Sequence, residues 1–120
     1  MTHIIEKHHQ AMEYTDEAFQ ARRNGDNEQA QAFFRQAFLC EREAAELVSS
    51  HTDAEPTRSV LHRSAATLAL DCGEFREAER LIAIALAGNP PDEIAEELRE
   101  LLEQVYQHWD TRKRPALAIS

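Results

Sequence analysis

Two glycines, Gly25 and Gly73, stand in the same pattern of small apolar residues, and this repeat constrains the fold more than any other feature. Small residues let two antiparallel helices approach closely, and a glycine can end a helix by adopting a positive φ. The pattern therefore predicts two helical hairpins that turn at the glycines. The matching positions are Ala18, Ala21, Ala30, Phe34 and Ala37 in the first copy and Ala66, Ala69, Ala78, Ile82 and Ala85 in the second.

Five amphipathic segments predict an all-α chain, separated by breaks at 24–27, 49–53, 72–74 and 88–91. Apolar residues recur every three or four positions over 27–48, which is typical of a helix with one buried face. Asp26 with Gln29 resembles a capping box, Asn89 is the expected N-cap of the fifth helix, and Pro56 is expected in the first turn of the third. We predict one domain over 1–110 and a basic tail over 111–120 that need not be ordered.

The segment 59–90 resembles a tetratricopeptide repeat through its small residues, turn glycine, following aromatic residue and closing proline. The matching residues are Ala66, Gly73, Phe75, Ala78, Ala85 and Pro90. The segment 11–40 matches less well, because Asn27 replaces the aromatic residue and no proline closes the unit. The two glycines are also 48 residues apart, whereas the family repeats every ~34 residues. The resemblance implies a five-helix array of two antiparallel tetratricopeptide-like hairpins plus a C-terminal capping helix.

This resemblance also implies a non-catalytic adaptor that binds a peptide or protein segment in a groove lined by the first helix of each hairpin. Arginines in this groove could receive a carboxylate, since guanidinium groups bind carboxylates bidentately; alternatively they are solvated charges of a helix face. The groove positions are Met12, Thr15, Phe19, Arg22 and Arg23 from the first helix, and Val60, Arg63, Thr67 and Leu70 from the third.

A formal net charge of -9 favours basic or neutral protein partners. It argues against nucleic acid, whose ligands normally carry a basic face. No apolar run approaches the ~18 residues of a membrane span, and residues 1–9 lack the long apolar region of a signal peptide. We therefore expect a cytoplasmic protein without membrane contact, cofactor or metal, which could form homo-oligomers through its end helices.

A small-ligand or metal-binding domain is the alternative hypothesis. A zinc ion could gather the N-terminal side chains His3, His8, His9 and Glu13, since residues at i and i+4 share a helix face. Residues 6–9 also contain the Glu-x-x-His spacing of di-metal bundles. Such bundles need a second copy of this motif, which the chain does not contain.

The region Arg58 to Arg63 offers a second alternative site, because helix N-termini bind anions. A phosphate or carboxylate could lie against the amides of Thr57 and Ser59 with Arg58 assisting. A capped helix entry without a ligand explains the same residues. Cys40 and Cys72 fit packing positions better than catalytic ones, since Cys72 is expected at a helix C-terminus, where the dipole disfavours a thiolate.

Overall fold

The computed structural model describes residues 2–113, with side chains described as far as Trp109, and every regular element in this part of the chain is an α-helix. The helices are α1 (Thr2–Arg23), α2 (Asn27–Val48), α3 (Thr57–Asp71), α4 (Phe75–Ala87) and α5 (Asp92–Lys113). The all-α prediction is confirmed, and α2 has the bounds that the apolar periodicity predicts.

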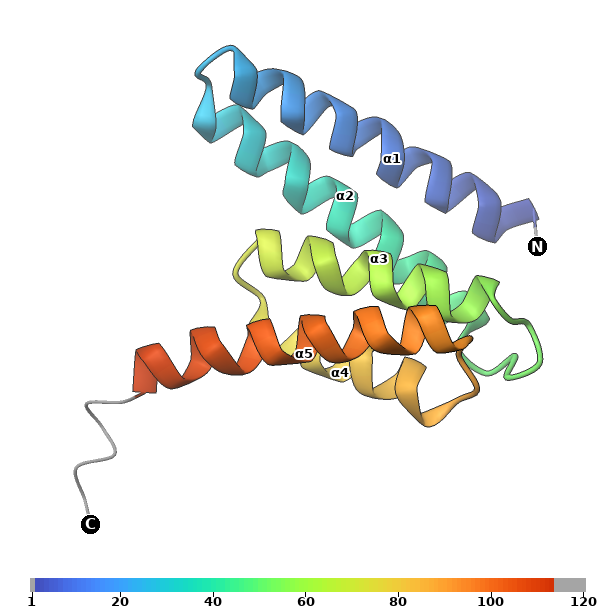
Figure 1. Cartoon of the computed structure of the whole chain (residues 1–120). Coiled ribbons are helices and arrows are strands. Elements are labelled where there is room, and N and C mark those ends of the chain that lie inside the picture. Colours follow the sequence, from blue (N-terminus) through green and yellow to red (C-terminus); the bar gives the residue numbers. More distant parts are fainter. Residues whose placement is uncertain (1, 114–120) are drawn as a thin grey trace.

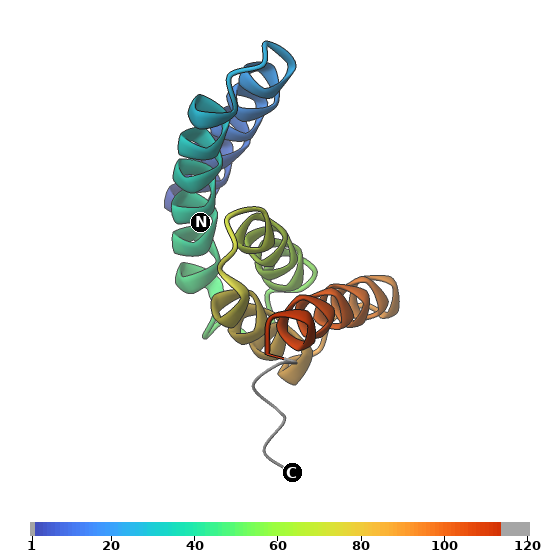
Figure 2. The same ribbon diagram turned by 90° about the vertical axis from the view of Figure 1, so that its left-hand side faces the viewer.

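The helices form two successive hairpins and a final helix. Helices α1, α3 and α5 run in one direction, and α2 and α4 return between them (Figure 1). Helix α2 packs against both α1 and α3, whereas α5 packs against α3 and α4. Figure 2 shows that this arrangement curves, so that α1, α3 and α5 line its concave side while α2 and α4 lie behind them.

The two glycine turns have the same backbone geometry. Gly25 has a φ of 81° and Gly73 a φ of 74°. After each glycine, the next amide donates to a carbonyl five residues earlier: Asp26 N to Ala21 O at 2.9 Å, and Glu74 N to the equivalent oxygen at 2.8 Å. These bonds satisfy carbonyls that the helix end leaves free. The predicted turns are therefore confirmed at both places.

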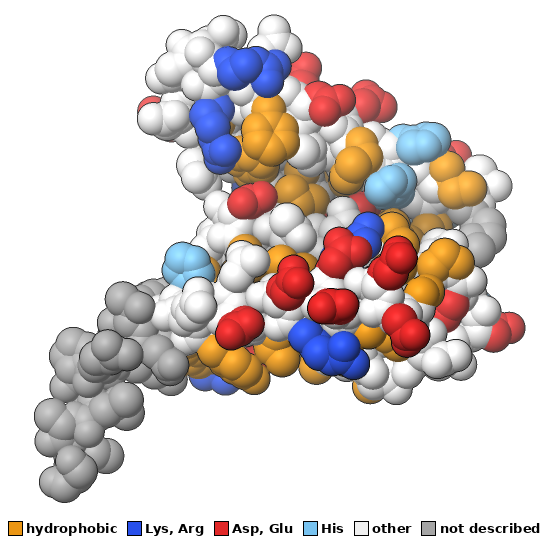
Figure 3. Space-filling view, viewed as in Figure 1, with side chains coloured by type: hydrophobic (Ala, Val, Ile, Leu, Met, Phe, Trp, Pro, Cys, Tyr) orange, Lys and Arg blue, Asp and Glu red, His pale blue; other side chains and the backbone are white. Residues whose placement is uncertain are grey.

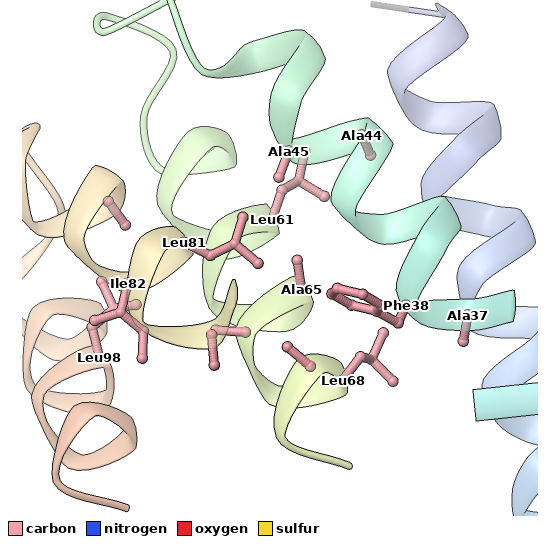
Figure 4. Close-up of a cluster of buried hydrophobic side chains, with 14 of the residues drawn as sticks. Ala37, Phe38, Ala44, Ala45, Leu61, Ala65, Leu68, Leu81, Ile82 and Leu98 are labelled. Atoms are coloured by element: carbon pink, nitrogen blue, oxygen red, sulfur yellow. The ribbon is translucent and has the colours of Figure 1, made fainter. Parts of the chain in front are cut away.

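The core consists of the alanines of the repeat and a few large side chains. Phe34 and Ile82, which occupy equivalent positions of the two copies, are both fully buried. Between the hairpins, Phe38 of α2 lies near Ala65 and Leu68 of α3 (Figure 4). Leu98 of α5 lies near Ile82 of α4 in the same view. One continuous core thus joins the two hairpins and α5.

Three predicted boundaries differ from those of the structure. Asn89 is not the N-cap of α5, because two prolines follow it and the helix begins only at Asp92, where Ala95 N donates to Pro91 O at 2.9 Å. Pro56 precedes α3 rather than lying in its first turn. Helix α5 continues past the predicted domain limit at 110 to Lys113, and the rest of the predicted tail, 114–120, lies outside the described residues.

Candidate functional site on the concave face

The α1 wall of the concave face carries four of the predicted groove residues in one stripe. Met12, Thr15, Phe19 and Arg22 follow one another at steps of three and four, so they share a face of the helix. Met12 and Thr15 are half-buried, whereas Phe19 is 42% exposed and Arg22 is exposed. Arg23 is exposed too, one residue beyond this stripe. The stripe thus combines apolar surface with a cation at its end.

Aromatic contacts fix the end of this stripe. The Phe19 ring meets the buried Phe34 ring edge-on, with centroids 5.3 Å apart. The Arg22 guanidinium lies 4.7 Å from the Phe34 centroid and 5.6 Å from that of Phe19. Arg22 also opposes the rise in the pKa of Asp71 that partial burial causes. The Arg22 guanidinium therefore lies over the rings of the first hairpin, and its charge acts on Asp71 at the end of α3.

Helix α3 supplies the floor of the concave face. Val60 and Leu70 are half-buried and pack against the core. Thr67 is exposed, and its hydroxyl donates to Arg63 O at 3.0 Å. The Arg63 guanidinium donates to the Glu97 carboxylate of α5 at 2.9 Å. The structure thus places all nine predicted residues on α1 and α3, but it pairs Arg63 with an acidic residue of the chain itself.

A buried carboxylate lies between α1 and α3. Glu41 of α2 is 0% exposed, and its two oxygens lie 2.9 and 3.0 Å from Nδ1 of His8, which is 33% exposed. Burial raises the pKa of the Glu41 carboxyl, and hydrogen bonds from Ser64 and His8 oppose the rise. An ionised Glu41 carboxylate only accepts hydrogen bonds, so Nδ1 of His8 is the donor whenever Glu41 is ionised. The pair joins α1 to α2.

A small pocket opens between α3 and α5, next to Arg63. Its volume is about 180 Å³, below the ~300–1,000 Å³ of typical small-molecule sites. Leu101 is half-buried and Glu100 is exposed at its wall. The size suits one side chain of a larger partner better than a whole metabolite. The lining residues are Arg63, Thr67, Glu97, Glu100, Leu101 and Gln104.

Two larger hollows follow the surface of α1, with volumes of about 460 and 420 Å³. Both are lined by residues of α1 alone, from His3 to Gln20. Without a wall on another element, they cannot enclose a ligand. The larger volume of these hollows does not make them better binding sites. The smaller pocket between α3 and α5 is the better candidate for a binding site, because two helices line it.

The start of α3 is occupied by the chain's own side chains. Ser59 donates from its amide and its hydroxyl to Oε1 of Glu55, at 3.1 and 2.7 Å. Arg58, which is 5% exposed, donates to Ser49 O at 2.8 Å and to Ile84 O at 3.2 Å. Glu55 thus takes the place proposed for an external anion, and Arg58 joins the ends of α2 and α4, where a cation is favoured by the helix dipole.

The N-terminal histidines do not converge with other ligands. No group of three or more histidine, cysteine, aspartate or glutamate side chains suited to a metal ion exists among the described residues. Cys40 and Cys72 are half-buried free thiols, and burial raises the pKa of both. A raised pKa keeps a thiol protonated and poorly nucleophilic at neutral pH.

Two features of the site were not predicted from the sequence: the buried Glu41, and the glutamates of α5 that line the pocket. One signal of Glu41 was present, because it stands within the apolar stripe of 27–48, three residues before Ala44 and three after Phe38. A charged residue at such a position is buried only if it finds a polar partner. For Glu97 and Glu100 the acidic surface of α5 gave no comparable sign, since exposed glutamates are common on helices.

Within residues 2–113, none of the helices combines the length and the apolar character needed to cross a lipid bilayer. Comparison of the chain with protein-family models, with curated proteins and with solved structures finds no match.

Proposed function

We propose that this chain is a non-catalytic interaction module that binds a peptide or protein segment along the concave face, in the groove between α1 and α3. One observation carries the proposal. The stripe from Met12 to Arg22 faces α3 across this concave side, and it leaves the large Phe19 ring 42% exposed. Exposed aromatic rings beside an arginine are typical of the residues that dominate binding energy at protein interfaces.

The form of the surface supports a macromolecular partner. Figure 3 shows an open face that is hollowed between α1 and α5, with apolar side chains next to charged ones. The pocket between two helices on this face has a volume of only about 180 Å³. An extended or helical segment can cover such a surface and place single side chains in its hollows.

The repeated turns support the resemblance to tetratricopeptide repeats. Gly25 and Gly73 share positive φ, and the alanines around both are buried. Helices α1 and α3 are the first helices of the two hairpins, which are the helices that line the groove in that family. The 48-residue spacing departs from the family's ~34 residues, so the proposal concerns the face and not a regular superhelix.

A peptide-display selection followed by NMR tests this proposal. Peptides selected on the full chain are expected to shift the amide signals of the α1 stripe and of α3. Phe19→Ala should weaken their binding about tenfold or more. Leu47→Ala is the matched control, because Leu47 is 39% exposed on the opposite helix, α2, of the same hairpin. Equal losses of peptide affinity in both variants, or amide shifts confined to α2 and α4, would contradict binding in the groove.

A further inference from the structure

The two walls of the concave face differ in charge. Over residues 92–109, helix α5 carries a single lysine or arginine, Arg99, against six acidic residues. Figure 3 shows acidic side chains gathered along this helix, on the side that borders the hollow. The α5 wall therefore favours a partner with positive charge. The acidic residues are Asp92, Glu93, Glu96, Glu97, Glu100 and Glu103.

The pocket between α3 and α5 can take one long cationic side chain. Half-buried Leu101 offers apolar surface for a methylene stem, and exposed Glu100, without a salt bridge among the described residues, offers a carboxylate for the head. Lysine and arginine side chains have this division into an apolar stem and a charged end. An anionic side chain would meet Glu100 and would compete with Glu97 for Arg63.

We propose that this pocket binds the basic segment 112–119 of a second copy of the chain; the inference rests on the proposed function, because the pocket shares Arg63 and Thr67 with the groove. Arg112, Lys113 and Arg114 are three consecutive cations. Pro115 and four small or apolar residues follow them. The segment thus offers positive charge for the acidic part of α5, residues 92–103, and apolar side chains for the stripe of α1.

Helix geometry favours a second copy over the same one. Helix α5 continues without a break to Lys113. The pocket ends at Gln104. At 1.5 Å per residue, Arg112 lies roughly 12 Å further along the same helix axis. The backbone of α5 therefore carries the start of the segment away from the pocket of the same copy, whereas the pocket of another copy is open to the segment.

Sedimentation velocity of the full chain over a range of concentrations tests whether segment 112–119 of one copy binds the pocket of another. We expect a reversible dimer whose association weakens in high salt, since the contact joins exposed charges. Glu100→Lys should weaken association about tenfold, and Arg112→Glu, Lys113→Glu and Arg114→Glu together should do the same or more. The control Glu17→Lys, an equal charge change on the exposed surface of α1, should leave the dimer unchanged. Circular dichroism melts establish that each variant is folded.

Mixing the two reversed variants gives the sharpest readout. The Glu100→Lys chain retains a basic segment, and the tail-reversed chain retains an acidic pocket, so their mixture should form a heterodimer about tenfold or more tighter than either variant forms alone. A chain that is monomeric at all concentrations, or a dimer that both reversals leave intact, overturns the proposal. If selected peptides still shift the α1 and α3 amide signals, the groove binds a partner but segment 112–119 is not that partner. If the peptides bind elsewhere, the proposed groove is wrong as well.

Discussion

Helices α1 and α2 have 22 residues each, whereas α3 and α4 have 15 and 13, although the same alanine and glycine pattern builds both turns. Equivalent positions behave alike close to the turn. Phe34 and Ile82 are both buried, and Phe19 and Thr67 are both exposed on the concave face. Away from the turn the hairpins differ, because α5 covers the second, whereas none of the helices within residues 2–113 covers the concave side of the first.

The repeated pattern therefore specifies the two hairpins, whereas the helix packed next to each hairpin decides which of its side chains remain exposed. In the second hairpin, the half-buried Arg63 pairs with Glu97 of α5. The first hairpin holds Arg22 over its own aromatic rings instead. The α1 stripe therefore keeps exposed apolar area, and exposed apolar area in a concave surface is what binding partners use.

The largest expected effect comes from emptying the equivalent core positions. Phe34→Ala should lower the free energy of unfolding by about 3–5 kcal/mol and Ile82→Ala by about 2–5 kcal/mol, because both side chains are fully buried. Urea unfolding followed by circular dichroism measures both. If the continuous core makes the hairpins one cooperative unit, each variant keeps a single transition. Two separate transitions would show that the hairpins unfold independently.

The junction between the hairpins is tested by Gly88→Ala. A Cβ at Gly88 would overlap with Nη1 of Arg58 and lie 3.2 Å from its Cζ. Arg58 is held by two carbonyls and cannot withdraw easily, so we expect a loss of about 1–3 kcal/mol. The same substitution in an Arg58→Ala background should cost much less, and a double-mutant cycle of urea unfolding measures the difference. Equal costs in both backgrounds would contradict the clash.

The two turns should respond equally to loss of their glycine. Gly25→Ala and Gly73→Ala each force a Cβ into a positive-φ conformation, and neither position has an atom within 4 Å of that Cβ. The cost is therefore backbone strain alone, about 1–2 kcal/mol at each turn. Gly25→Asn and Gly73→Asn should cost less, since asparagine tolerates this region. Thermal melts of the four variants compare the turns, and a clearly unequal pair would break their equivalence.

A smaller difference is expected at the caps that follow the turns. Asp26 accepts a hydrogen bond from Gln29 N at 3.0 Å, whereas Glu74 makes no such bond and instead pairs with Arg35 on the surface. Asp26→Ala should cost about 1 kcal/mol, and Glu74→Ala at most about 0.5 kcal/mol. Chemical denaturation of both variants measures the gap. A larger loss at Glu74 would mean that the surface pair matters more than the cap.

The stability of the chain should depend on pH through the buried His62. Burial lowers the pKa of His62, and nearby Arg58 and Arg80 add to this effect, while its hydrogen bond to Arg58 O and the charge of Glu55 oppose it. A lowered pKa means that the fold prefers the neutral ring. His62 therefore stabilises the fold above its ordinary pKa, 6.5, and this contribution is lost as the pH falls through the folded value.

Melting temperatures between pH 8 and pH 4 test this sign. The wild-type chain should lose stability below about pH 6.5, and His62→Gln should lose less over the same range. His51→Gln is the control, because His51 is exposed. Glu41 acts in the opposite direction, since its raised pKa favours the protonated form and penalises the fold as the pH rises. If His62→Gln loses as much melting temperature in acid as the wild-type chain, protonation of another group causes the loss.

Much of the helical framework was predictable from the chain alone. The periodicity over 27–48 gave the bounds of α2, and the offsets around Gly25 and Gly73 gave both hairpins. The start of α5 was misjudged by the choice of Asn89, because the effect of two successive prolines outweighs a favourable capping side chain. The sequence was enough to assign the groove side chains to the first and third helices. It could not predict which side chains they contact, such as Glu97 for Arg63.

The helical segments and the positions of the turns follow from the order of residues along the chain, because both depend on neighbours a few positions apart. Packing of the helices is needed to bring Glu41 to His8, Arg58 to the ends of α2 and α4, and Arg63 to Glu97. These contacts join residues distant in the chain. They depend on the packing angles between helices, which are set by the fit of side chains across each interface and not by any local pattern.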